Sequence, residues 1–168
     1  MNSEELRQIQ APLKEKYKAD PDSAIITLHA EGNLGEGVTC NISTGKKLAA
    51  IAGLHPATGG TGIELCSGDM LLEALTACAG VTLKAVATAL RIDIKAGTVH
   101  AEGDIDFRGT LAVDKAAPVG FKDIRLSFKL DTNATEEEMN SLMKLTERYC
   151  VVYQTLKTPP EIKINYSN

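Results

Sequence analysis

The chain has 168 residues, of which 43% are hydrophobic and 24% charged, with a net charge of −4 and an isoelectric point near 5.4. This size predicts one globular domain, and the acidic balance excludes a general nucleic-acid-binding surface, which is normally basic. The start, MNSEELRQIQ, has no positively charged leader before an apolar run, so we expect a cytoplasmic protein. The longest uncharged run of the most apolar segment, residues 74–83, is too short to cross a membrane.

Residues 3–18 predict a charged helix, interrupted or restarted at Pro12 because proline removes a helical hydrogen bond. A turn at 20–23 follows. We expect residues 1–23 to form a helical extension and residues 24–168 a single domain. This domain opens with segments of strand character and then a glycine-rich loop. The expected strands are 24–31, 38–43 and 46–53, and the expected loop is 55–68.

Residues 67–90, SGDMLLEALTACAGVTLKAVATAL, predict a long and almost wholly apolar helix. At about 100° per residue, its charged side chains and the arginine that follows fall within one sector about 60° wide. These are Asp69, Glu73, Lys84 and Arg91. A helix that meets water along so narrow a strip must be covered on most sides, and one sheet face covers only part of it. We therefore expect a homodimer with this helix in or beside the interface.

Two later segments alternate between apolar and polar residues, which is typical of antiparallel strands with one wet face. They are TVHAEGDIDFR, 98–108, and KDIRLSFKLD, 122–131, with a loop between them. Residues 135–150 predict a second helix, with a capping box formed by Thr135 and Glu138. EIKINY, 161–166, has the pattern of a last strand. The expected fold class is α+β, an antiparallel sheet packed against two long helices.

The four cysteines are scattered along the chain at Cys40, Cys66, Cys78 and Cys150. None forms a C-x-x-C pair and no histidine lies at metal-ligand spacing, so we expect neither structural zinc nor any other metal or bound cofactor. Cys78 and Cys150 both fall on the apolar faces of their helices. Each alone is compatible with plain core packing, because free cysteine is among the most buried residue types.

The local surroundings of the two thiols distinguish them. The neighbours of Cys78 one turn away include Val81 and Thr82, and none is cationic, so burial would raise the thiol pKa unless another strand or subunit supplies a cation. Cys150 has Glu147 one turn before it and lies near a helix C-terminus, both of which disfavour a thiolate. If the two act together, Cys78 should attack and Cys150 should resolve.

At these residues the sequence resembles the OsmC/Ohr family. LLEALTACAGVTL, 71–83, is similar to the first-cysteine helix of that family, and ERYCVVYQTL, 147–156, is similar to its second-cysteine motif. The order of elements over about 24–166 matches as well. The resemblance implies an OsmC-like fold, an intertwined homodimer and thiol-dependent reduction of organic hydroperoxides. It makes Cys78 the peroxidatic and Cys150 the resolving residue, with a small or protein dithiol as external reductant and an antioxidant role in oxidative stress.

Two activating groups of the established peroxidases in that family have no counterpart. A Pro-Glu pair at the start of the first helix is replaced by Ser67 and Gly68, and the chain has no arginine between Arg7 and Arg91. The candidate cations that remain are Lys46, Lys47 and His55. Cys66, just before the expected helix start, could also participate, although an inert loop cysteine is the simpler interpretation.

Two other functions compete with the peroxidase. A non-enzymatic dimer could use the same apolar cleft to bind a small molecule, which the missing arginine and glutamate favour. A redox sensor could instead use oxidation of Cys78 and Cys150 to change its subunit contacts.

Overall fold

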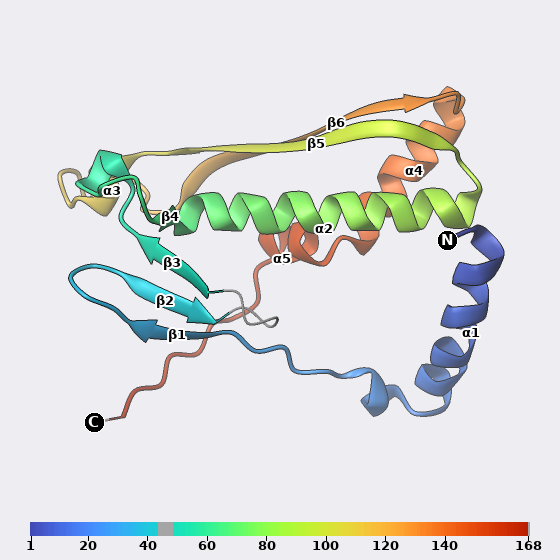
Figure 1. Cartoon of the computed structure of the whole chain (residues 1–168), viewed down its shortest axis with the longest axis horizontal. Coiled ribbons are helices and arrows are strands. Elements are labelled where there is room, and N and C mark those ends of the chain that lie inside the picture. Colours follow the sequence, from blue (N-terminus) through green and yellow to red (C-terminus); the bar gives the residue numbers. More distant parts are fainter. Residues whose placement is uncertain (44–48, 168) are drawn as a thin grey trace. The chain divides into compact units, whose positions relative to one another are not determined.

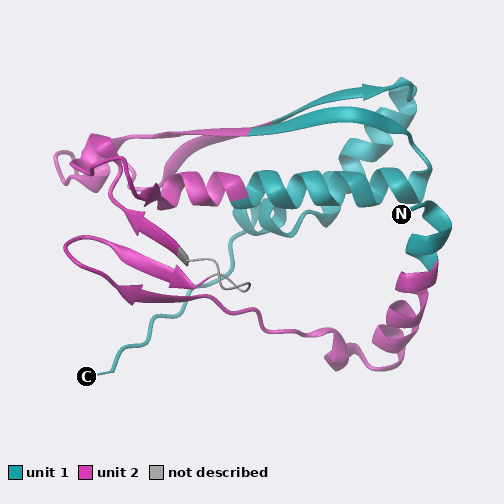
Figure 2. Ribbon diagram, in the orientation of Figure 1, with its two compact units in different colours: residues 1–7, 74–100, 127–168 teal, residues 8–73, 101–126 magenta. Residues whose placement is uncertain are grey.

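The computed structural model describes residues 1–43 and 49–167. The chain divides into two compact units, coloured separately in Figure 2. The thiol unit, which carries Cys78 and Cys150, comprises 1–7, 74–100 and 127–168, and the sheet unit comprises 8–73 and 101–126. The expected boundary at residue 23 stays a prediction.

Helix α1, Ser3–Ala19, begins at residues where Asn2 and Glu5 cap each other through side chain and backbone (2.8 and 2.9 Å). It continues through Pro12, so the predicted helix is present without the predicted interruption. Proline lacks the N–H that would complete the helical ladder at this point, but its fixed φ suits a helix.

The core of the thiol unit lies along α2, Ser67–Leu90, whose buried residues recur at helical spacing. Leu83, Val86 and Ala87 pack with Ile94 and Leu142 in one apolar cluster, and each leucine buried there contributes about 1.5–3 kcal/mol. Among the described residues, α2 is the one helix long and apolar enough to cross a membrane. Such a helix is weak evidence for a span, because a core helix has the same composition.

Strands β5, Ile94–Ile105, and β6, Phe121–Thr132, form a two-stranded sheet, seen as the long ribbons of Figure 1. Within the thiol unit, Leu130 lies against Gly97. A Cβ added at Gly97 would be 2.6 Å from Cδ2 of Leu130. The predicted alternation is confirmed, since Val99, Ala101 and Ile105 are partly covered while Glu102 is exposed. The first strand ends earlier than predicted, because Asp106 caps the short helix α3, Phe107–Thr110.

The second predicted helix is confirmed as α4, Glu136–Tyr149, with the expected capping box between Thr135 and Glu138. The backbone leaves the helical region at Cys150 (φ −74°, ψ 107°), and a second short helix, α5, starts immediately at Val151–Lys157. Cys150 therefore lies at the junction of two helices.

The sheet unit contains β1, Glu31–Leu34; β2, Cys40–Ser43; β3, Ala49–Gly53; and β4, Leu65–Cys66, in that spatial order. The first three pair antiparallel, and β3 pairs with β4 in parallel, so this sheet is mixed where a purely antiparallel one was expected. The predicted strand at 24–31 is mostly not formed. A 3₁₀ turn, η1, occupies Pro21–Ala24, and β1 starts at Glu31.

Three further expectations have different outcomes. The predicted loop at 55–68 contains a 3₁₀ turn, η2, at Pro56–Thr58 as well as β4. Residues 46–48 of the predicted third strand lie outside the described residues. The predicted last strand at 161–166 has no secondary structure, and Ile162, Ile164 and Tyr166 are between 83% and 92% exposed. A strand exists only when another strand supplies its hydrogen bonds.

Candidate functional site: a buried pair of thiols

Cys78 lies on the flank of α2, between a covered and an uncovered face. The covered face is centred on Leu75, Ala79 and Leu83, each at most 3% exposed. On the other side Val81 is 73% exposed, and Cys78 itself is half-buried. The thiol is therefore half-buried and lies next to the face of α2 on which Val81 is exposed.

Cys150 is far from Cys78 in the sequence but lies beside it in the thiol unit. It is 1% exposed, and the helical turn before it is intact, because its N–H donates to the Thr146 carbonyl at 3.0 Å. Its own carbonyl accepts from the N–H of Gln154 at 2.9 Å, which opens α5. Both sulfurs are free thiols, and a side-chain hydrogen bond links Cys150 to Cys78. The structure thus brings the two predicted site residues into contact.

The pKa of Cys78 is lowered from its ordinary value although burial, the largest influence, acts to raise it. Hydrogen bonding from the backbone N–H of Val152, the Cys150 thiol, the Thr82 hydroxyl and the backbone N–H of Val151 outweighs burial. Donors that face a thiolate favour the charged form. The sequence-based expectation that its surroundings would raise this pKa is therefore wrong, because the first residues of α5 were not expected beside it.

The pKa of Cys150 is raised, first because the group is buried, and also through its hydrogen bond to Cys78 and the charge that Cys78 carries once ionised. Hydrogen bonding from the backbone N–H of Tyr153 and Val152 offsets this only in part. The two thiols titrate as one coupled system in which Cys78 loses its proton first. Of the two thiols, Cys78 is therefore the one that ionises more readily, and Cys150 is the one that keeps its proton.

Of the candidate cations named from sequence, the structure describes only His55. His55, in the sheet unit, caps η2, where its Nδ1 accepts from the N–H of Ala57 at 3.0 Å, and its ring stacks on Phe107 at 5.0 Å. Lys46 and Lys47 lie outside the described residues. The donors that lower the Cys78 pKa are all neutral.

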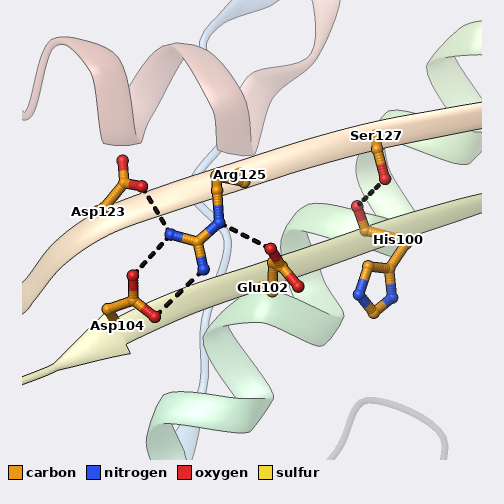
Figure 3. Close-up of polar contacts among 6 residues, drawn as sticks. All are labelled: His100, Glu102, Asp104, Asp123, Arg125 and Ser127. Atoms are coloured by element: carbon orange, nitrogen blue, oxygen red, sulfur yellow. Dashed lines mark hydrogen bonds and ion pairs between the residues drawn. The ribbon is translucent and has the colours of Figure 1, made fainter.

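The arginines of the sheet unit are already bound to carboxylates. Arg125 on β6 makes a two-pronged contact with Asp104 (2.7 and 3.1 Å) and also binds Glu102 and Asp123, as Figure 3 shows. We call these four residues the Arg125 cluster. Hydrogen bonding to Arg125 is the main cause of the lowered pKa of Asp104. All four side chains are more than 40% exposed, and exposed ion pairs contribute little to stability.

The other two cysteines have no such partner. Cys66 is the last residue of β4, half-buried, with its sulfur near Gly68 at the start of α2. Cys40 is half-buried on β2, against Gly32 of the neighbouring strand. Within residues 1–43 and 49–167, no group of three or more histidine, cysteine or acidic side chains could hold a metal ion.

The sequence placed Thr82 one turn from Cys78, but the hydrogen bonds that the groups around the thiols make were not foreseen. Thr82 follows Cys78 by one helical turn, and this spacing is itself a usable signal for a hydroxyl beside the sulfur. The N–H groups of Val151 and Val152 could not be found this way, because their position depends on the helix break at Cys150. The unpaired hydroxyl of Thr146 could not be found this way either, because the lack of a partner among the described residues depends on how the elements pack.

Solved structures share this α+β fold. The OsmC-like protein of Mycoplasma pneumoniae has a TM-score of 0.66 at 17% identity, over 80% of this chain and 89% of that chain. An organic hydroperoxide resistance protein from Elizabethkingia anophelis has a TM-score of 0.63 at 17% identity, over 80% and 91%. Another, OsmC from Legionella pneumophila, has a TM-score of 0.62 at 17% identity, also over 80% and 91%. At such identities the likeness shows the OsmC-like fold alone.

The family follows from the sequence itself. A model of the OsmC-like protein family matches residues 60–165, which include α2, β5, β6, α4 and α5. The chain belongs to the OsmC-like family, and the resemblance found from the two cysteine motifs is confirmed. Comparison with curated proteins gives no match.

Proposed function

We propose that this protein is a thiol-dependent peroxidase that reduces organic hydroperoxides, with Cys78 as the peroxidatic and Cys150 as the resolving cysteine. The observation that carries the proposal is the contact between the two thiols, whose pKa values are shifted in opposite directions. A peroxidatic sulfur must be ionised to attack, and a resolving thiol must lie within reach of it. Structural neighbours described as organic hydroperoxide resistance proteins support the choice of substrate.

The reaction balances without a bound metal or cofactor. The Cys78 thiolate attacks one oxygen of the hydroperoxide, the O–O bond breaks, and the alcohol leaves with a proton while Cys78 becomes a sulfenic acid. The Cys150 sulfur then attacks the Cys78 sulfur. The S–O bond breaks, and the hydroxide takes the Cys150 proton and leaves as water. The resulting disulfide is reduced by an external dithiol, which is itself oxidised to a disulfide.

The donors to Cys78 that the structure describes are neutral, and this favours one alternative within the same chemistry. A cation stabilises a thiolate more strongly than neutral donors do, because charge-assisted hydrogen bonds are about twice as strong. A pair activated only by amides and hydroxyls would react slowly, which suits a redox sensor better than a catalyst. Turnover with excess hydroperoxide and dithiol distinguishes the two, since a sensor is oxidised once and consumes little substrate.

We propose that the active form is a cytoplasmic homodimer. In the thiol unit, Val81 is 73% exposed on the uncovered face of α2, and in the sheet unit Leu34 and Ile63 are 92% and 87% exposed. The segment 161–166 alternates apolar and polar residues without a strand partner. Large exposed apolar side chains, and a segment with a strand pattern but no strand partner among the described residues, both favour contact with a further surface. Val81→Glu should therefore yield monomers in sedimentation analysis, and an unchanged dimer would contradict this assignment.

The test of the main proposal starts from the reduced full-length protein. One equivalent of cumene hydroperoxide is added, the thiols are alkylated, and the modified cysteines are mapped by mass spectrometry. We expect one disulfide, between Cys78 and Cys150, with Cys40 and Cys66 alkylated. Consumption of further hydroperoxide should then require a dithiol.

Three results would count against the proposal. Oxidation that begins at Cys66 would place the chemistry elsewhere. Formation of the disulfide without turnover in the presence of dithiol would favour the sensor. Unoxidised thiols together with binding of an apolar molecule would favour a non-catalytic binding protein.

A further inference from the structure

The deepest residues of α4 form one row, and its middle member is polar. Leu142, Thr146 and Cys150 follow one another at four-residue spacing and are 0%, 2% and 1% exposed. The Thr146 hydroxyl has no hydrogen-bond partner among the residues that the structure describes. A buried hydroxyl without a partner is destabilising, because it has given up water and gained nothing in return. A valine would fill the same volume without this cost.

The position of this hydroxyl relative to Cys150 is fixed by the helix. Residues four apart lie on one face of an α-helix, one above the other. The turn from Thr146 to Cys150 is regular, since the Cys150 N–H donates to the Thr146 carbonyl at 3.0 Å. Threonine in a helix has two accessible χ1 rotamers, so its hydroxyl can turn between directions without moving the backbone. The side chains of Thr146 and Cys150 therefore lie on one face, one helical turn apart, and the Thr146 hydroxyl has no partner among the described residues.

The resolving step would be helped by a hydrogen-bond donor near the Cys150 sulfur. In the reduced pair, Cys150 is protonated and hydrogen-bonded to Cys78. Once Cys78 has become a sulfenic acid, Cys150 must give up its proton and attack, and negative charge develops on a sulfur that is 1% exposed. Water cannot solvate that charge at this depth. A hydroxyl donor beside it lowers the barrier, because hydrogen bonding to the charged form favours that form.

We propose that Thr146 is the hydrogen-bond donor that stabilises the Cys150 sulfur while it attacks the oxidised Cys78. This inference rests on the proposed function, and it assigns Thr146 a role in the resolving step only. In that step the S–S bond forms, the S–O bond of the sulfenic acid breaks, and the Cys150 proton leaves with the hydroxide as water. Thr146 keeps its own proton throughout.

The experiment follows the fate of the sulfenic acid in the reduced full-length protein. Wild type, Thr146→Val and Thr146→Ser are each treated with one equivalent of cumene hydroperoxide in the presence of dimedone, which traps sulfenic acids. Intact-protein mass spectrometry then gives the ratio of disulfide to dimedone adduct. We expect this ratio to fall about tenfold in Thr146→Val, the loss of one hydrogen bond to a charged group. Thr146→Ser, which keeps the hydroxyl, should stay near wild type.

Two controls separate this role from a structural one. Thr88→Val removes a partnered helix hydroxyl, which donates to the Lys84 carbonyl at 2.8 Å, and should leave the ratio unchanged. Thr146→Val should unfold at the same or a higher denaturant concentration than wild type, because it removes an unpaired buried hydroxyl.

An unchanged ratio in Thr146→Val, or a clear loss of its stability, would overturn the role of Thr146 while leaving the peroxidase intact. If wild type gives neither adduct nor disulfide, the proposed function fails and this inference fails with it.

Discussion

The thiol pair and the Arg125 cluster are both regions where neighbouring side chains shift pKa values, but they differ in almost every other respect. The thiol pair is neutral when reduced, with Cys150 1% exposed and its donors drawn mainly from uncharged amides and hydroxyls. The Arg125 cluster holds one guanidinium against three carboxylates, and its side chains are 42–64% exposed. If charge were the only criterion, the Arg125 cluster would be chosen as the candidate site before the thiol pair.

From this difference we infer that burial, rather than charge, marks the candidate site. Water screens the ion pairs of the Arg125 cluster, so the loss of one partner changes the stability of the protein little. At the thiol pair, Cys150 is 1% exposed and Cys78 is half-buried, so water weakens the hydrogen bonds less, and single hydroxyls and amides determine which thiol ionises. A perturbed pKa marks a functional site only where the group is also shielded.

The largest expected effect on hydroperoxide consumption comes from removing the Cys78 sulfur. Cys78→Ser should reduce hydroperoxide consumption to the uncatalysed rate, because a serine hydroxyl is not ionised at neutral pH and does not attack the O–O bond. The measurement is peroxide loss with excess dithiol. Cys66→Ser is the matched control and should keep full activity. Equal losses in both variants would contradict the assignment to Cys78.

Removing the Cys150 sulfur should change the oxidation product that forms at Cys78. In Cys150→Ser the Cys78 sulfenic acid has no internal partner, so repeated exposure to hydroperoxide should oxidise it to sulfinic acid. Mass spectrometry after successive additions should show two added oxygens on Cys78, where wild type shows a disulfide. A protein that keeps cycling at the wild-type rate would mean that Cys150 does not resolve.

A smaller effect is expected from the hydroxyl beside Cys78. Thr82→Val removes one donor that faces the sulfur, so the pKa of Cys78 should rise and alkylation at neutral pH should slow several-fold. Thr82→Ser should restore both. The measurement is the pH profile of iodoacetamide labelling at Cys78. An identical profile for Thr82→Val would show that the backbone amides of α5 activate the thiol without help.

The Arg125 cluster should respond least. Arg125→Met leaves three exposed carboxylates without their cation, and we expect unchanged hydroperoxide consumption and a small loss of stability that added salt reduces. Denaturation at low and high salt measures this. A loss of activity would show that the cluster participates in the reaction and would break the contrast with the thiol pair.

A second exposed ion pair, between Asp106 and Arg108, predicts how stability depends on pH. Hydrogen bonding from Arg108 (2.6 Å) lowers the pKa of Asp106 from 3.8 to about 2. Because the folded value is the lower one, the stabilisation is complete above pH 3.8 and is lost as pH falls through about 2. An NMR titration should give this value, and Arg108→Met should return it toward 3.8.

Most elements with a strong local pattern were predictable from the sequence. The apolar face of α2, the alternation of β5 and β6, and the capping box of α4 each depend on residues within one element. Elements that depend on partners were not. Residues 24–31 and 161–166 have strand patterns but stay largely without strand partners, and the short strand β4 exists only because β3 lies beside it.

The sequence by itself determined the family, through its two cysteine motifs, and the faces on which Cys78 and Cys150 lie, because helical periodicity assigns a face to every residue. Only the tertiary structure decided that the two sulfurs meet, that the break at Cys150 turns two backbone amides toward Cys78, and that the Thr146 hydroxyl is left unpaired. These facts concern distances between segments far apart in the chain. Packing sets such distances, whereas periodicity carries information only about the element in which it occurs.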